Sequence, residues 1–232
     1  MTGGERMTGG ERMTGGERMA VSTQPGNWVA NVLRFVRPRD VAAEDYCNLC
    51  SAPLAANHPH LVEPAKHRLL CVCRGCATLL GNRDDNRYRA VPEYARRLEE
   101  FRMTDAEWEA FAIPIGLAFF VCSTPDRRIV AFYPGPAGST ESLLDLPAWA
   151  QLVAGNPILT ALEPDIEALL VNRVKGAREY YLAPIDRCYA LVGLIRTKWR
   201  GLSGGDEAWK AIDEFFAGLH ELRDSAGACR HG

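Results

Sequence analysis

The chain of 232 residues has no hydrophobic run that approaches the roughly 20 residues needed to cross a bilayer. Its start also lacks the charged, apolar and small-residue segments that together mark a secretory signal. A formal net charge of -2 gives no overall attraction to nucleic acid or to anionic membranes. These absences argue against a membrane span, export and a nucleic-acid partner, and we expect a cytoplasmic protein.

Familiar catalytic motifs are missing as well. The chain has no Gly-x-Ser-x-Gly turn, no Walker loop, no Gly-x-Gly-x-x-Gly loop and no His-Glu-x-x-His pair. Only His220 and His231 follow His67, so general bases are scarce in the second half. We therefore predict no catalytic residue and no organic cofactor site. An enzyme built on the carboxylates at 163–167 or on the loop at 133–142 remains the alternative.

Cysteine, in contrast, is abundant and clustered. Five of the eight cysteines lie within residues 47–76, as two Cys-x-x-Cys hooks separated by 22 residues, with one further cysteine just ahead of the second hook. Cys122, Cys188 and Cys229 stand alone, which is typical of a reducing compartment rather than of a disulfide framework. Two hooks joined by a hairpin bring four thiolates to one tetrahedral ion. The predicted metal ligands are Cys47, Cys50, Cys73 and Cys76.

Zinc is the metal that we expect, because it closes a four-thiolate shell at about 2.3 Å per bond and leaves no position for a substrate. Iron is the alternative, since tetrahedral sulfur also describes a rubredoxin-like site. Rubredoxin hooks usually carry glycine or proline around the second cysteine, whereas Cys50 is followed by Ser51-Ala52-Pro53 and Cys76 by Ala77-Thr78. These surroundings favour zinc.

Three more residues are candidate extra ligands: Cys71, His58 and His60. Cys71 could replace one member of the second hook, serve as a redox-active spare thiolate, or pack as a small hydrophobic residue. Alternation along a strand would place it on the same side as Cys73. The histidines in the spacer could supply an imidazole ligand or a hydrogen bond from outside the ligand shell.

The chain divides by composition into six segments. Three copies of Met-Thr-Gly-Gly-Glu-Arg precede Met19 and have no apolar face, so we expect a disordered start and a working protein that begins near Met19. The predicted segments are disordered repeats at 1–18, an N-terminal helix and linker at 19–44, a metal knuckle at 45–80, a helical connector at 81–112, an α+β body at 113–224 and a tail at 225–232.

Patterning within these segments predicts an α+β fold, with a small four-cysteine, zinc-ribbon-like knuckle followed by an antiparallel sheet of about four strands that helices cover on one face. A capping box at Thr104–Glu107 should open a short helix. The predicted strands are 115–123, 128–133, 166–174 and 179–183, with a loop at 133–138. The predicted helices are 27–36, 92–101, 147–154, 157–162, 184–199 and 206–222.

Longer stretches of the chain resemble an uncharacterised, mainly actinobacterial protein family of unknown function that is encoded in gene clusters of high-affinity nickel–iron hydrogenases. The resemblance covers roughly residues 45–222. Its best-matching stretches are Cys47–Pro53, His58–Leu61, Leu69–Cys76, Ile113–Phe120, Ala131–Ser142, Asp165–Arg173, Pro184–Tyr189, Leu191–Arg196 and Trp199–Gly205.

By association, the resemblance implies an accessory factor for hydrogenase assembly or electron delivery, whose partner is a hydrogenase subunit or a maturation factor. Residues 133–142 and 199–205 would be candidate partner or ligand surfaces. We therefore predict a zinc-binding accessory protein that acts through protein–protein interaction, with a rubredoxin-like electron carrier as the alternative. Changing Cys50 or Cys73 to serine should unfold residues 45–80 and spare the body.

Overall fold

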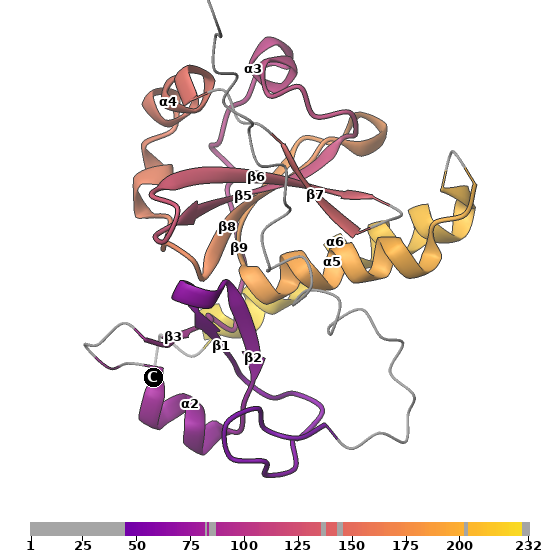
Figure 1. Ribbon diagram of the computed structural model, residues 1–232. Coiled ribbons are helices and arrows are strands. Elements are labelled where there is room, and N and C mark those ends of the chain that lie inside the picture. Colours follow the sequence, from indigo (N-terminus) through magenta and orange to yellow (C-terminus); the bar gives the residue numbers. More distant parts are fainter. Residues whose placement is uncertain are drawn as a thin grey trace, which may run out of the picture.

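The computed structural model describes residues 45–228, apart from residues 82, 84–86, 136–137, 143–145 and 202–203. The predicted repeats at 1–18 and the predicted helix at 27–36 lie outside the described residues. Two antiparallel sheets and the helices around them make up the described part (Figure 1). The α+β class is therefore confirmed. No helix among the described residues is both long and apolar enough to cross a membrane.

The main sheet has six strands rather than about four, in the order β4-β9-β8-β5-β6-β7, and each pair of neighbours is antiparallel. The four central strands lie where the β-rich runs predicted them. The strands are β4 (Arg96–Arg97), β5 (Leu117–Ser123), β6 (Arg128–Gly135), β7 (Gly138–Ser142), β8 (Glu167–Asn172) and β9 (Glu179–Pro184).

Both additional strands lie at the edges of the sheet, where the predictions were wrong. Residues 92–101 were expected to be helical, but Arg96 and Arg97 pair with Leu182 and Tyr181 of β9. Strands β6 and β7 instead extend into the expected loop at 133–138, and Gly135 pairs with Gly138. In both places pairing with a neighbouring strand, which local sequence does not reveal, overrides the local preference.

Helices cover both faces of the main sheet, not one as predicted (Figure 1). Along β5, Leu117, Phe119 and Val121 face the α5–α6 side, whereas Ala118 and Phe120 face the α3–α4 side. Because both faces are buried, the strand reads as a continuous apolar run. The helices are α3 (Asp105–Ala110), α4 (Leu146–Gly155), α5 (Ile185–Lys198) and α6 (Gly205–Ala228), with short 3₁₀ turns η2 (Pro157–Ala161) and η3 (Val174–Gly176).

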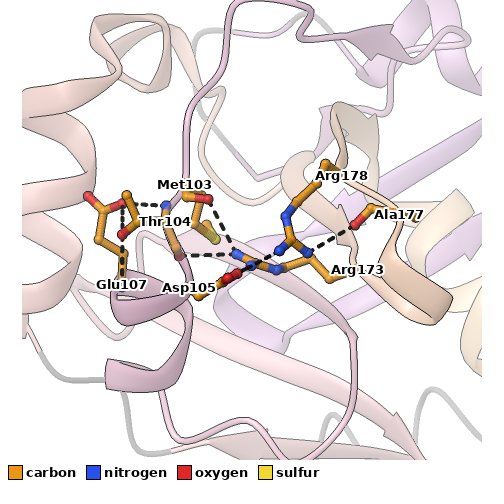
Figure 2. Close-up of polar contacts among 7 residues, drawn as sticks. All are labelled: Met103, Thr104, Asp105, Glu107, Arg173, Ala177 and Arg178. Carbon is orange, nitrogen blue, oxygen red and sulfur yellow. Dashed lines mark hydrogen bonds and ion pairs between the residues drawn. The ribbon is translucent and has the colours of Figure 1, made fainter.

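The predicted capping box at the start of α3 is present. The Thr104 side chain accepts a hydrogen bond from the Glu107 backbone N–H, and the Glu107 carboxylate accepts one from the Thr104 backbone N–H. Beside this cap, the buried guanidinium of Arg173 donates to the carbonyls of Met103 and Thr104 and pairs with Asp105 (Figure 2). This network fastens the start of α3 to the end of β8.

A second, smaller sheet carries the cysteine region and has the strand order β2-β1-β3. It precedes the main sheet in the chain and packs beside it (Figure 1). We call it the small sheet. Its elements are β1 (His60–Glu63), the 3₁₀ turn η1 (Pro64–Lys66), β2 (Arg68–Cys71), α2 (Arg74–Leu80) and β3 (Arg89–Ala90).

The two faces of the small sheet have different neighbours. Leu61 and Leu70 are cross-strand partners and pack in a small cluster with Cys47 and Val72. The next pair, Val62 and Leu69, belongs to the core that the main sheet forms with α5 and α6. One face of the small sheet therefore supports the cysteine region, and the other packs against the body.

Candidate metal centre

The first Cys-x-x-Cys hook is a tight turn. The Cys47 N–H donates to the Ala52 carbonyl over 2.8 Å, and the Ser51 N–H donates to the Cys47 carbonyl over 2.9 Å. Ser51 has a φ of 60°, a left-handed conformation that reverses the chain directly after Cys50. The turn thereby brings both sulfurs of the hook to the same side.

The second hook opens helix α2. Cys73 is the N-cap residue of this helix, with extended backbone angles, and its Sγ accepts a hydrogen bond from the Cys76 N–H over 3.4 Å. Because Cys76 lies in the first turn, the helix holds its side chain next to that of Cys73. The strand β2 ends at Cys71, so strand alternation does not extend to Cys73 as the sequence suggested.

The two hooks meet at one point. The sulfurs of Cys47, Cys50, Cys73 and Cys76 all lie within 4.8 Å of one another, and the Cys50 and Cys73 sulfurs are 3.7 Å apart. Four sulfurs placed tetrahedrally at about 2.3 Å from a zinc ion would be about 3.8 Å apart. The separation is far longer than a disulfide bond of about 2.05 Å. All seven described cysteines are free thiols. The cluster could thus hold a metal ion.

The cluster lies at the edge of the molecule. Cys47 is buried against Leu61 and Leu70, whereas Cys50 is exposed and both Cys73 and Cys76 are half-buried. A metal ion would therefore contact protein on one side and lie close to solvent on the other. In such a position the ion would bind from the solvent side as the two hooks close around it.

Two thiols of the cluster, those of Cys47 and Cys76, have pKa values shifted in opposite directions. Burial disfavours the Cys47 thiolate, but hydrogen bonds from the backbone of Cys73, Cys50 and Leu49 outweigh it and lower its pKa to about 6. Burial and the neighbouring thiols raise the pKa of Cys76 to about 12. A Cys47 thiolate thus disfavours ionisation of Cys76 until a cation neutralises the two charges. Metal binding should accordingly release protons.

The candidate extra ligands lie in a different group. His58, His60 and Cys71 each offer a ligand atom within 4.8 Å of the other two, and this group contains no member of the two hooks. The assignment of particular ligands remains a prediction. What the structure adds is that these three residues are gathered with one another rather than around the four cysteines.

The carboxylates that motivated an enzymatic alternative have local partners. Asp165 accepts hydrogen bonds from the backbone and side chain of Thr124 over 2.9 and 2.6 Å. Glu163 pairs with Arg89 at 2.8 Å, and Glu167 accepts a hydrogen bond from the Glu163 N–H. Glu141 and Asp165 do border a common cavity, but its volume is about 60 Å³. Typical ligand pockets are about 300 Å³ or larger.

Asn48 contributes to the centre, and sequence reasoning missed it. Its N–H donates to the Cys71 carbonyl, and its side-chain oxygen accepts from the Cys71 N–H, both over 2.9 Å. Asn48 thereby fastens the first hook to the end of β2. Its place inside the first hook was visible in the sequence, but its partner depends on how the hook docks.

Comparison with known protein families gives one match. The model of a family of unknown function, DUF5947, matches residues 46–223, which include both hooks, the small sheet and the main sheet. Among curated proteins and among solved structures, nothing matches this chain.

Proposed function

We propose that this chain, which belongs to the DUF5947 family of unknown function, is a zinc-binding accessory protein that acts by binding another protein. One observation carries the metal assignment. Four cysteine sulfurs, two from each hook, lie within 4.8 Å of one another. Cys50 of the first hook and Cys73 of the second have sulfurs that are 3.7 Å apart. Four thiolates brought together in this way repel one another unless a cation neutralises them.

The metal would have a structural role. Four thiolates occupy all four positions around a tetrahedral zinc ion and leave none for a substrate. The cluster that underlies the hooks contains only four buried residues, Cys47, Leu61, Leu70 and Val72. A core this small does not supply enough burial to hold a module of this length together, so metal binding would contribute much of its folding free energy.

The surface around the hooks supports a protein partner. Leu79 lies on α2 one turn beyond Cys76, and 72% of its side chain is exposed. Tyr46, next to Cys47, is 53% exposed. These are the two most exposed large hydrophobic residues in the described part of the chain. Exposed aromatic and aliphatic side chains, on a surface that a bound metal would hold in place, are suited to anchor a contact with another protein.

The identity of the partner rests on the resemblance described above. By that association it would be a subunit or maturation factor of a nickel–iron hydrogenase. The alternative role, electron transfer, would need iron in the same four-cysteine site, because zinc has no accessible redox change. The two roles predict different metals in the same four-cysteine site.

Metal analysis of the protein, purified anaerobically from its native host, tests the metal assignment. We expect one zinc ion per chain that resists dialysis, and no visible absorbance. Cys50→Ser should lose this ion, whereas Cys122→Ser, a control outside both hooks, should keep it. Iron with thiolate charge-transfer bands that bleach on reduction would replace this proposal with the electron-transfer role.

Capture of the partner tests the second half of the proposal. A tagged chain expressed at native level should retain a hydrogenase component, and Leu79→Asp should reduce the yield. Ile158→Asp is the matched control, because Ile158 is 38% exposed but lies on η2, in the body. Equal yields from both variants would exclude α2 as the contact surface. Absence of every hydrogenase component from the wild-type sample would remove that link and leave the metal assignment standing.

A further inference from the structure

We infer that His58, His60 and Cys71 form a second metal site, distinct from the four-cysteine cluster, which takes a single Zn²⁺-like divalent transition metal ion. The three residues each place a ligand atom within 4.8 Å of the other two. The site would have three protein ligands and one coordination position left for water or an external ligand. The proposed function does not require it.

Strand register creates the core of this site. His60 of β1 and Cys71 of β2 are direct cross-strand partners, so their side chains lie on the same face of the small sheet. His58 comes from the segment just before β1, and its ring centroid is 4.9 Å from that of His60. The Val72 N–H donates to the Pro59 carbonyl over 3.0 Å, which fixes the histidine-bearing segment beside the end of β2.

The two sites use opposite faces of the small sheet. Leu61 and Leu70 belong to the cluster that contains Cys47. Since successive side chains of a strand alternate, His60 shares its face with Val62, and Cys71 shares its face with Leu69. That face packs against the body. The second site is therefore at the junction between the small sheet and the body.

Both histidine rings are held in the way that metal-binding histidines are held. The Nδ1 atom of His60 is 3.0 Å from an Asp186 carboxylate oxygen, and the Nδ1 atom of His58 is 2.9 Å from the Ala55 carbonyl. A carboxylate or carbonyl on one ring nitrogen fixes the tautomer and directs the other nitrogen to the metal. In both residues the nitrogen directed to the metal in this way would be Nε2.

The Nε2 atom of His58 supplies independent support. It is buried and has no hydrogen-bond partner among the described residues. A buried polar nitrogen without a partner costs free energy, and native proteins rarely leave one in that state. A metal ion bound by His60 and Cys71 would satisfy it.

The donor set indicates the kind of metal and the strength of binding. Two imidazoles and one thiolate suit zinc and its neighbours in the first transition series rather than calcium or magnesium. With Zn²⁺ the site carries a net charge of +1, compared with -2 for four thiolates. The thiol of Cys71 gives up one proton when the metal–sulfur bond forms. With fewer thiolates and an open position, this ion should exchange faster than the one held by the hooks.

Zinc titration of the full-length, metal-stripped chain tests the second site. We expect two equivalents for the wild type and one for the variant that combines His58→Gln with His60→Gln. Cys71→Ser should also bind one. His67→Gln is the matched control and should bind two, since His67 lies in the same hairpin but outside the group. A wild type that binds one equivalent, or histidine variants that still bind two, would overturn the inference.

The ion bound by the four cysteines shows whether a histidine variant has lost only the second site or its whole fold. The histidine variants should keep the first equivalent and its cobalt spectrum, in which four thiolates give intense charge-transfer bands. A second cobalt equivalent should add a weaker thiolate band that Cys71→Ser removes. If one equivalent is lost on changing the histidines but not on changing Cys50, the second site exists and the proposed structural zinc fails.

A milder variant separates metal affinity from hairpin structure. Asp186 touches His60 but is itself on α5, so Asp186→Asn leaves every ligand in place. We expect it to weaken the second equivalent about 10–100-fold and to leave the first unchanged, as is usual for loss of a partner that orients a ligand. Unchanged affinity for both equivalents would show that Asp186 does not orient a metal ligand, and would count against the site.

Discussion

The imidazole of His60 lies 3.0 Å from the carboxylate of Asp186, a contact that joins the small sheet to the first turn of α5. It does not act alone. Val62 and Leu69, on the same face of the small sheet, belong to the core of the body, and Arg89 donates to the Pro164 carbonyl over 2.5 Å. The small sheet, which carries the cysteine region on its other face, therefore packs against the body.

Truncation of Leu69 should destabilise both regions together. Leu69→Ala removes a side chain that is 7% exposed in the shared core, and we expect a loss of about 2–5 kcal/mol in the free energy of unfolding. Denaturant titration followed by tryptophan fluorescence would measure it. Leu79→Ala is the control, because an exposed leucine should cost about 0.5 kcal/mol or less. Equal costs for the two variants would contradict the shared core.

Removal of the metal should affect the two regions unequally. A chelator, or Cys73→Ser, should abolish amide-exchange protection in α2 and in the first hook, because their own cluster is small. The main sheet should stay protected but melt at a lower temperature, since it loses the packing of Val62 and Leu69. Exchange measured by mass spectrometry would resolve the segments. A main sheet that unfolds at once with the hooks would refute a separable body.

Glu63 should make stability depend on acid pH. Its carboxylate is almost fully buried; burial alone would raise its pKa, but Lys66 at 2.7 Å and Arg68 at 2.7 Å outweigh burial and lower the pKa. Because the pKa is lower in the folded state, ionised Glu63 stabilises the fold at pH values above its ordinary pKa of about 4.5. This stabilisation is lost as the pH falls through the lowered pKa of the folded state.

The matched variant for this effect is Glu63→Gln. We expect it to cost about 1–3 kcal/mol near pH 7 and progressively less as the pH falls to about 3. Glu141→Gln, which disrupts a more exposed pair with Arg128, should cost about 1 kcal/mol or less at any pH. Denaturation curves at several pH values would show the difference. A cost for Glu63→Gln that is constant with pH would exclude the ionised carboxylate as its source.

Two arginines that share Asp105 should differ greatly in importance. Arg173 donates to two backbone carbonyls (Figure 2). Its side chain is 4% exposed and lies over the Trp108 ring, whereas that of Arg178 is 49% exposed. Arg173→Met should cost about 2–4 kcal/mol, because the carbonyl of the buried Met103 and the Asp105 carboxylate both lose a charged donor. Arg178→Met should cost about 0.5 kcal/mol. Thermal and denaturant unfolding would measure the cost of each substitution. Similar costs for the two variants would contradict the expectation that the buried arginine matters more.

Local signals predicted a large part of this fold. The four central strands, the helix at 184–199 and the capping box at Thr104 all follow from patterns within a few residues of the chain. The edge strand at Arg96–Arg97 does not, because nothing apolar or β-branched marks it and only its pairing with β9 creates it. Coverage of both sheet faces also depends on how the helices dock.

The candidate site shows the same division. The spacing of the hooks predicted which four cysteines would meet, because both hooks form from nearby residues, one as a tight turn and the other at the start of a helix. The separate group of His58, His60 and Cys71 could not be predicted, because it depends on the register that places His60 opposite Cys71. A shift of one residue in the pairing of β1 with β2 would have placed the side chains of His60 and Cys71 on opposite faces of the sheet. The role of Asp186 likewise depends on a contact between residues more than a hundred positions apart.

The β4 edge of the main sheet limits how other chains can bind there. Residues 96–98 cover the outer side of β9. Arg96 and Arg97 pair with Leu182 and Tyr181, and the Leu98 N–H donates to the Tyr180 carbonyl. Beyond it, β4 itself is only two residues long and carries two positive charges. Short, charged borders of this kind discourage a further strand from joining. At this edge a binding partner would accordingly recognise the protein by its side chains rather than by adding a strand to the sheet.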